Sequence, residues 1–405
     1  MEEIIQLQPI INIGCLGSVS DGKSTLIAKL TGIKTQKHSD ELKRNITINQ
    51  GYGNMKIFND DNNNLYTTDS TGFIEDTKLV NHISFVDCPG HHELIQTMLS
   101  SIVLMDGAII VVAVNQPFSQ KPQLIQHLAA TKLGKINKII VCMNKIDLVS
   151  KEILRERKIE LDILLEEYDI KPFAIIPTCF NKKINIKYVI KAIMELFNPS
   201  EYINKLTDNP IFRISRSFDI NKPGCDWLDI SGGVIGGSLF NGKLKVGDKI
   251  EIKPGQMTKG KDGKYICKTI ITNIISIKTD TIELTNIIPG GLIGIKTDLD
   301  PYYCKHNGLS GQIAGLINTL PDLSFDIILK INIVKIFGFE WIPKINDNIM
   351  LQIGTKINDA KLIKINNDEY TCILGKPTCI TKNQHIIVCY NINKVIKIVG
   401  DGYIV

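Results

Sequence analysis

The feature that most constrains the fold is a glycine-rich loop between a strand-like run and a helix-like run. Residues 10–16 are almost entirely apolar, residues 17–24 read GSVSDGKS, and a helical pattern over 23–30 ends at Gly32. This G-x-x-x-x-G-K-S spacing in that context predicts a loop whose backbone N–H groups wrap a phosphate at the start of a helix. The alternative is an ordinary glycine-rich turn before a helix.

The pattern around this loop continues through about the first 200 residues as alternating strands and helices, which is typical of a mostly parallel sheet with helices on both faces. We expect strands over 10–16, 82–87, 107–115, 138–143 and 173–178, and helices over about 23–30, 120–133, 151–168 and 186–197. The intervening segment 33–81 is polar and irregular, apart from an expected edge strand at 54–58. The sequence therefore predicts an α/β P-loop domain.

The character of the chain changes after residue 199. From Pro210 onward it has short β-rich runs, frequent Gly and Pro, and little helical periodicity. Regular turn signals between short strands indicate Greek-key barrels, and this stretch is too long for one small barrel. We expect a nucleotide-binding domain over 1–206 and two β-barrel domains over 207–320 and 321–405.

Composition excludes several classes of protein. Hydrophobic residues make up 43% and charged residues 22%, as in folded globular chains. The longest apolar run, 107–114, is far short of the ~20 residues that cross a bilayer, and the N-terminus is acidic where a targeting peptide would be basic. A net charge of +5 does not by itself argue for nucleic acid. Ten cysteines without a CxxC pair favour buried thiols in a reducing compartment, so we expect a cytoplasmic protein with no membrane partner.

The loop and a second motif predict how a nucleotide and its metal are held. Lys23 would contact the β- and γ-phosphates. Mg²⁺ would be bound by Ser24 and, through a water, by Asp87 in the strand-ending DCPG. Thr47 could add its hydroxyl to Mg²⁺ or be a plain β-branched loop residue, and spacing alone favours neither. The residues expected to line the phosphates are Gly17, Ser20, Asp21, Gly22, Lys23, Ser24, Thr25 and Gly90.

A third motif selects the base. Asn144, Lys145 and Asp147 form NKID after an apolar strand, and a carboxylate there accepts from N1 and the 2-amino group of guanine. Adenine offers neither donor and would leave Asp147 unpaired. In isolation, NKxD is more often a solvated strand-to-helix turn, but behind a phosphate loop it favours guanine specificity.

His91, directly after Gly90, is the candidate catalytic residue. An imidazole there could orient the attacking water, a role that needs position more than basicity. A lone histidine is more often structural.

Longer stretches resemble the gamma subunit of eukaryotic and archaeal translation initiation factor 2 from about residue 10 to the C-terminus. They include NIGCLGSVSDGKST, ELKRNITINQGYGNMKIF, HISFVDCPGHHELIQTML, NKIDLV, IFRISRSFDINKPG, KVGDKIEIKPG and IPGGLIGIKTDLDP. The combination of RNITI and GYGN with FDINKPG separates this family from elongation factor Tu, its structural relative.

The resemblance implies a GTPase domain followed by two β-barrels. It implies that the GTP-bound form carries methionyl initiator tRNA to the small ribosomal subunit, within a heterotrimer with alpha and beta subunits. Hydrolysis on start-site selection would be promoted by a GTPase-activating factor, and GDP release by an exchange factor. Carried onto this chain, the resemblance makes Thr47 the metal ligand of the first switch, Asp87 and Gly90 the start of the second, and His91 the residue that positions water. Cys179 and Phe180 match the last guanine-binding loop.

Several departures from the family pattern carry expectations. Ser18 and Asp21 stand where the family has histidines, and the Asp21 carboxylate should repel phosphates unless a cation or N–H groups compensate; a solvated, harmless Asp21 is the alternative. Many relatives have a zinc knuckle, but 59–80 contains no cysteine, so we predict no zinc. Cys179-Phe180 replaces a typical Ser-Ala pair, but the backbone N–H of Phe180 could still serve the guanine oxygen. Ser231 replaces a frequent lysine, which removes one charge facing RNA.

Two other functions stay open at this point. One is an elongation-type or selenocysteine-type tRNA carrier, and the other is a GTP-binding scaffold subunit that scarcely hydrolyses GTP. Lys243, Lys245 and Lys253 are candidates for contact with an RNA backbone, or members of a solvated strand face.

Overall fold

The structure is a computed structural model that describes residues 2–34, 51–69, 71–89, 95–201, 206, 209–222, 224, 226–261, 263–335, 339–392 and 395–405. The chain divides into two compact units, Met1–Tyr202 and Ile203–Val405.

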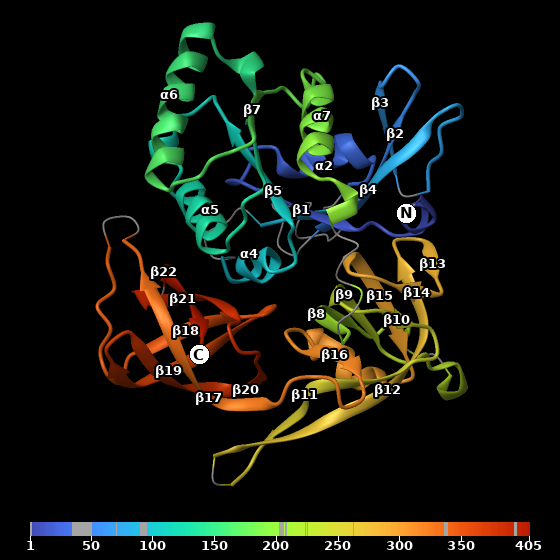
Figure 1. Cartoon of the computed structure of the whole chain (residues 1–405), viewed down its shortest axis with the longest axis vertical. Helices are drawn as coiled ribbons and strands as arrows, with labels where there is room; N and C mark the ends of the chain where they lie inside the picture. Colours follow the sequence, from blue (N-terminus) through green and yellow to red (C-terminus); the bar gives the residue numbers. More distant parts are fainter. Residues whose placement is uncertain are drawn as a thin grey trace. The chain divides into compact units, whose positions relative to one another are not determined.

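The first unit is built on a seven-stranded sheet in the order β3-β2-β4-β1-β5-β6-β7 (Figure 1). Strands β4, β1, β5, β6 and β7 run parallel, and β2 is antiparallel to both of its neighbours. The strands are β1 (Ile11–Leu16), β2 (Gly51–Asn59), β3 (Leu65–Thr68), β4 (Lys78–Asp87), β5 (Gly107–Ala113), β6 (Ile139–Asn144) and β7 (Ala174–Pro177). The predicted mostly parallel sheet is confirmed.

The predicted edge position of the strand at 54–58 is wrong. That strand is β2, which pairs with β4 on one side and with the short β3 on the other, so β3 is the edge. The Asn- and Asp-rich run between them forms the connecting turn, because Asp60 Oδ1 accepts from the backbone N–H groups of Asn62 (2.9 Å) and Asn64 (2.8 Å). A four-residue strand after such a polar turn leaves little apolar pattern in the sequence.

Helices cover both faces of this sheet. Every residue of β1, β5 and β6 is buried, which requires cover on each side. Helix α2 packs on β1, β2 and β4, α7 packs on β6 and β7, and α4 packs on α5 (Figure 1). The helices are α1 (Glu2–Leu7), α2 (Lys23–Thr31), α4 (Ile95–Ile102), α5 (Pro122–Leu133), α6 (Lys151–Glu167) and α7 (Ile186–Leu196), with 3₁₀ turns η2 (Phe118–Gln120), η3 (Ile146–Leu148) and η4 (Pro199–Glu201).

The second unit begins with a six-stranded antiparallel barrel, in which β11-β16-β8-β9-β15-β12 is closed by pairing of β12 with β11. Its apolar core includes Phe212, Ile214 and Ile250. The elements are β8 (Ile211–Phe218), β9 (Val234–Asn241), β10 (Leu244–Lys245), β11 (Lys249–Lys259), β12 (Tyr265–Thr279), β13 (Ile282–Leu284), β14 (Asn286–Ile287), β15 (Gly290–Thr297) and β16 (Ile313–Leu316), with 3₁₀ turns η6 (Trp227–Asp229) and η7 (Pro301–Asn307).

A second closed barrel follows in the order β17-β20-β19-β18-β21-β22. Its core includes Leu329, Leu351 and Trp341. The strands are β17 (Leu323–Ile333), β18 (Asn348–Ile353), β19 (Lys356–Asn366), β20 (Glu369–Cys379), β21 (His385–Ile392) and β22 (Val395–Ile404). The predicted pair of barrels is confirmed, while the domain limits at 206/207 and 320/321 stay predictions.

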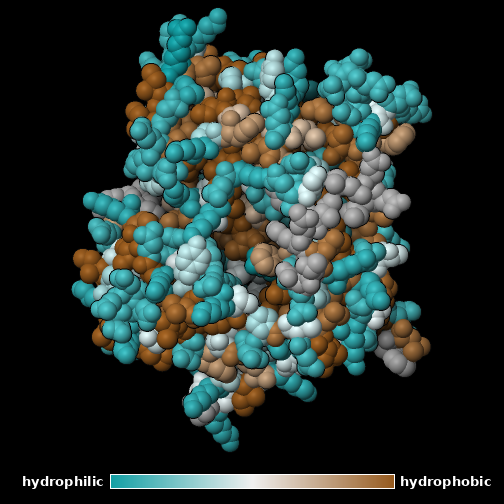
Figure 2. Space-filling model, in the orientation of Figure 1, coloured by the Kyte–Doolittle hydropathy of each residue, from teal (hydrophilic) through white to brown (hydrophobic). Residues whose placement is uncertain are grey.

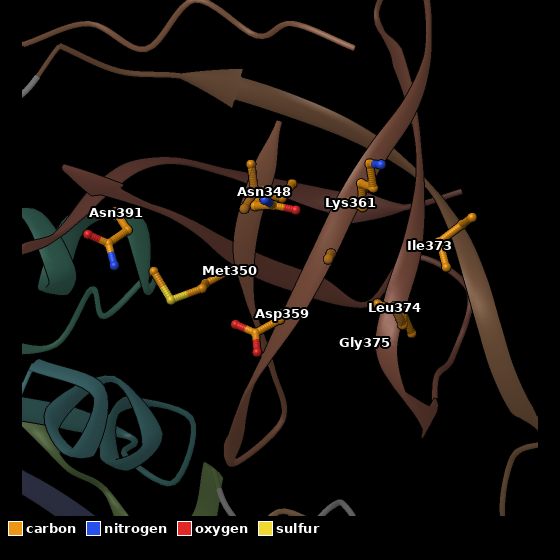
Figure 3. A pocket seen from close by; sticks show the side chains of 10 residues that line it. Asn348, Met350, Asp359, Lys361, Ile373, Leu374, Gly375 and Asn391 are labelled. Carbon is orange, nitrogen blue, oxygen red and sulfur yellow. The ribbon is translucent and has the colours of Figure 1, made fainter. Parts of the chain in front are cut away.

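A hollow of about 440 Å³ lies on the second barrel, over β18, β19 and β20 (Figure 3). Apolar residues Ile349, Ala360 and Leu374 line it together with Asp359 and Lys361, both of which are exposed. None of the predicted nucleotide-binding residues belongs to this hollow.

The face shown in Figure 2 mixes hydrophilic and hydrophobic residues. No helix among the described residues is long and apolar enough to span a membrane. The nine cysteines in the described ranges are all free, and eight of them are buried.

Candidate nucleotide-binding site

The predicted motifs lie at the carboxyl ends of neighbouring strands in the first unit. The phosphate loop follows β1, Asp87 ends β4, Asn144 ends β6, and Cys179 comes two residues after β7. The strands stand in the order β4-β1-β5-β6-β7 and are parallel, so these ends meet at one edge of the sheet. Residues far apart in the sequence are thereby brought together.

The phosphate loop has the backbone conformation of a turn that only glycine tolerates at two points. Gly17 has φ 138°, and a Cβ there would lie 2.1 Å from the carbonyl oxygen of Val111. Gly22 has φ 107°, and a Cβ there would lie 2.3 Å from Asn144 Nδ2. Strand β5 and Asn144 therefore press directly on this loop, which explains both glycines of the motif.

Lys23 lies folded across the loop. Its Nζ donates to the carbonyl oxygen of Ser18 over 2.8 Å, and the residue is buried. Burial lowers the pKa of Lys23, and the nearby carboxylates of Asp87 and Asp21 act in the opposite direction. A buried ammonium beside a loop of backbone N–H groups is suited to a phosphate.

The loop also leaves a polar group available. Ser18 Oγ is buried and has no hydrogen-bond partner within the described part of the chain. Together with the buried Lys23 ammonium, this donor fits a phosphate oxygen. Ser24, partly buried in the first turn of α2, and Asp87, fully buried at the end of β4, are oxygen donors of the type that Mg²⁺ prefers.

The Asp21 side chain turns into the protein. It is 1% exposed, so the alternative of a solvated Asp21 is wrong. Its Oδ1 forms an ion pair with Lys121 Nζ at 2.6 Å, and its Oδ2 accepts from the backbone N–H of Ser18 over 2.9 Å. These are the cation and the N–H group that the sequence argument required to offset the repulsion of phosphates. Of the other predicted loop residues, Ser20 is exposed and Thr25 is partly buried.

Asn144 joins the guanine motif to the phosphate loop. Its Nδ2 donates to the carbonyl oxygen of Asp21 over 2.8 Å, and its Oδ1 accepts from the backbone N–H of Phe180 over 3.2 Å. The Phe180 N–H that was expected to serve the guanine oxygen thus contacts Asn144 here. Lys145 follows in a left-handed conformation with φ 65°.

Asp147 has two partners of its own. The Cys179 thiol hydrogen-bonds the carboxylate and holds the pKa of Asp147 below its usual range, with Lys182 adding to the effect. Lys182 Nζ lies 3.1 Å from Asp147 Oδ2. Burial, followed by the hydrogen bond to Asp147, raises the pKa of Cys179. An ionised carboxylate at this point is the acceptor that guanine needs.

Three predicted site residues, Thr47, Gly90 and His91, lie outside the described residues. Two contacts escaped the sequence argument, those of Lys121 with Asp21 and of Lys182 with Asp147. Lys182 lies in the loop that carries Cys179 and could have been considered, whereas Lys121 carries no motif signal. The described residues hold no cluster of three or more His, Cys, Asp or Glu side chains suited to a metal, and the expectation of no zinc stays a prediction.

Comparison with known families defines the class of this chain. The Elongation factor Tu GTP binding domain family matches residues 8–199, and Elongation factor Tu domain 2 matches residues 232–308. The fold and these matches define a translational GTPase, a class that works with Mg²⁺ and hydrolyses GTP. The family Initiation factor eIF2 gamma, C terminal matches residues 340–404.

Full-length relatives narrow the class. The chain is 35% identical to eukaryotic translation initiation factor 2 subunit gamma of Encephalitozoon cuniculi (strain GB-M1), over 99% of this chain and 94% of that protein. It is 34% identical to eukaryotic translation initiation factor 2 subunit 3 of Drosophila melanogaster, over 99% and 90%. The chain belongs to the family of the gamma subunit of eukaryotic translation initiation factor 2, and is a GTPase of translation initiation.

Solved structures share the fold. A bacterial selenocysteine-specific elongation factor, EF-Sec, aligns with a TM-score of 0.75 and 22% identity. The alignment covers 98% of this chain and 58% of EF-Sec. The elongation factor SelB of Methanococcus maripaludis, in complex with the GTP analogue GppNHp, aligns with a TM-score of 0.72 and 19% identity, over 98% of this chain and 79% of that one. At these identities the likeness concerns the fold alone.

Proposed function

We propose that this chain, in its GTP-bound form, binds methionyl initiator tRNA, delivers it to the small ribosomal subunit and hydrolyses GTP on start-site selection. It would do so in the cytoplasm, with alpha and beta subunits, a GTPase-activating factor and an exchange factor as partners. The observation that carries this proposal is the 35% identity over nearly the whole of a gamma subunit, with a phosphate loop and NKID at one sheet edge.

Different residues of the chain would bind the phosphates, the base and the metal ion of the nucleotide. Lys23 and the N–H groups of the loop would hold the phosphates, Asp147 would select guanine, and His91 would orient water. Ser24, Thr47 and Asp87 would hold Mg²⁺, which when bound neutralises charge on the β- and γ-phosphates. Closure of the segments that contain Thr47 and Gly90 on the γ-phosphate would make the tRNA-binding form depend on GTP.

Lysines of the first barrel are candidate contacts for the tRNA backbone. Lys296 Nζ on β15 lies 3.2 Å from Ser231 Oγ, so a cation stands beside the position where a lysine was expected. Lys243 and Lys245 are exposed and fit the same role. Lys253 fits it less well, because its side chain is 16% exposed and its Nζ lies 3.5 Å from Glu251 Oε1 and 3.3 Å from the Leu320 carbonyl oxygen.

The test compares binding of methionyl initiator tRNA and of an elongator aminoacyl-tRNA, each with GTP and with GDP. We expect tight binding only of the initiator tRNA with GTP. A hundredfold preference for GTP over GDP corresponds to only ~2.7 kcal/mol, which a few loop contacts can supply. Equal affinities in all four conditions would defeat the proposal.

A second candidate is a carrier of the selenocysteine type. The fold that this chain shares with EF-Sec and SelB is compatible with such a carrier. The same experiment decides between the two candidates, with selenocysteyl-tRNA added as a third tRNA. Preference for that tRNA over the initiator would replace the first proposal.

A further inference from the structure

Asp21 and Lys121 form a buried ion pair although they stand 100 positions apart in the chain. The distance between Lys121 Nζ and Asp21 Oδ1 is 2.6 Å, and the two side chains are 7% and 2% exposed. One partner belongs to the phosphate loop, and the other is the residue directly before α5.

The pair is the centre of a larger set of contacts. Asp21 Oδ1 also accepts from the backbone N–H of Ala113 over 3.2 Å, and Lys121 Nζ also donates to the carbonyl oxygen of Ala113 over 2.8 Å. Asp21 Oδ2 accepts from the Ser18 N–H within the loop. These contacts fasten the loop to the end of β5 and to the start of α5.

Placing the Lys121 ammonium group at this position is unfavourable in free energy. The N-terminal end of a helix carries a partial positive charge, which disfavours an ammonium group there. Taking both charges out of water costs more than it returns unless the geometry is good, so a buried pair is weak evidence for stability. A role in holding a particular geometry explains the pair better.

The loop needs such a restraint. Ser20 has φ 63°, a left-handed conformation that is strained for a residue with a Cβ, and Gly17 and Gly22 flank it with positive φ. Asp21 lies between Ser20 and Gly22, and its carbonyl oxygen also accepts from Asn144. The ion pair of Asp21 with Lys121 therefore restrains the phosphate loop at the residue that also contacts Asn144 of the guanine motif.

We infer that Asp21 and Lys121 act as a clamp that holds the phosphate loop in its nucleotide-binding shape and so sets how long a guanine nucleotide stays bound. Asp21 is then a positioning residue whose carboxylate faces Lys121, not a ligand of the phosphates. This inference rests on the proposed nucleotide site.

The test measures release of a fluorescent GDP analogue into excess GDP, alongside thermal unfolding, for the full chain and for D21N, K121M and the double variant D21N/K121M. We expect each single variant to release the analogue at least about tenfold faster, a change of about 1.4 kcal/mol. The double variant should also release the analogue at least about tenfold faster than wild type. Its increase should be well below the product of the two single increases, because both residues act through one ion pair. K121R, which keeps the charge, should release the analogue more slowly than K121M does.

The matched control is K158M, which removes the lysine of an exposed ion pair on α6, with Lys158 Nζ 2.6 Å from Asp162 Oδ2. Its release rate should equal that of wild type. If a single variant does not fold, the release rate of the double variant tests the clamp, because that variant leaves no buried charge unpaired. Lower melting temperatures with unchanged release, or additive effects in the double variant, would overturn the clamp. A wild-type chain that binds no guanine nucleotide would instead refute the proposed nucleotide site.

Discussion

The side-chain amide of Asn144 donates a hydrogen bond of 2.8 Å to the backbone carbonyl of Asp21, across 123 positions of sequence. The same side chain accepts from Phe180, so one buried residue touches the phosphate loop and the last guanine loop. Asn144 therefore orients both the phosphate loop and the last guanine loop without itself needing to contact the base. Recognition of the base and retention of the phosphates should therefore fail together when this residue is lost.

Replacing Asn144 with alanine should weaken binding of GTP and GDP alike. Two buried hydrogen bonds are lost at ~1–2 kcal/mol each, which predicts an affinity loss of about 30-fold or more. Fluorescence titration measures it. Asn358 on β19 is equally buried and lies in the second barrel, so N358A is the control and should keep the wild-type affinity. An N144A protein with intact nucleotide affinity would contradict the bridging role.

Replacing Asp147 with asparagine should change the preferred base. An amide can donate to the second carbonyl oxygen of xanthine but no longer accepts from both donors of guanine. We expect GTP affinity to fall by about 100-fold or more and xanthosine triphosphate affinity to rise, as competition titrations would measure. K182M is the control, because the exposed Lys182 is lost while Asp147 remains, and it should change GTP affinity by less than about threefold. Unchanged selectivity in D147N would exclude Asp147 from base recognition.

Lys296 offers a test of the proposed RNA-facing surface that leaves the residues of the nucleotide site unchanged. If it contacts a phosphate, K296A should weaken initiator tRNA binding and reduce the slope of log affinity against log salt by about 1. The control is K278A, since Lys278 is an exposed lysine on β12 that pairs with Glu283 at 2.8 Å. A slope that stays the same in K296A would remove this lysine from the interface.

Two buried histidines predict how stability depends on pH. Burial lowers the pKa of His82 and of His127 to about 3, so the unfolded chain binds protons between pH 6.5 and 3 that the folded chain does not. Stability should therefore be full above pH 6.5 and fall below it, by up to about 1.4 kcal/mol per pH unit for each histidine.

Calorimetry between pH 7 and pH 5 measures this dependence, and the transition that GDP shifts to higher temperature identifies the first unit. H127Q should be less stable at pH 7 but should lose about half of the pH dependence. A first unit equally stable at pH 5 and pH 7 would show that neither histidine is kept neutral by burial.

Much of the fold follows from local patterns in the sequence. Helix α2 and strand β1 could be predicted because the glycine-rich loop, the apolar run and Gly32 lie next to one another. Strand β3 could not, since its four residues follow a polar turn and are paired only through β2. Helix α4, over Ile95–Ile102, was also not expected.

The candidate site was predictable to a similar degree. Its motif residues can be identified by their types and spacing. Lys121 cannot, because its role depends on β5 and α5 bringing it next to Asp21. Ser231 is the converse case, because the sequence predicts a missing charge there, whereas Lys296 of β15 brings its Nζ to 3.2 Å from Ser231 Oγ. A prediction made position by position misses such compensation, which is a property of the folded sheet.

The buried pair at the phosphate loop has a consequence for the history of this chain. Neither Asp21 nor Lys121 can be exchanged alone for a neutral residue without stranding the other charge away from water. Descendants of this sequence should therefore keep both residues or lose both, and the two positions should drift as a single inherited unit.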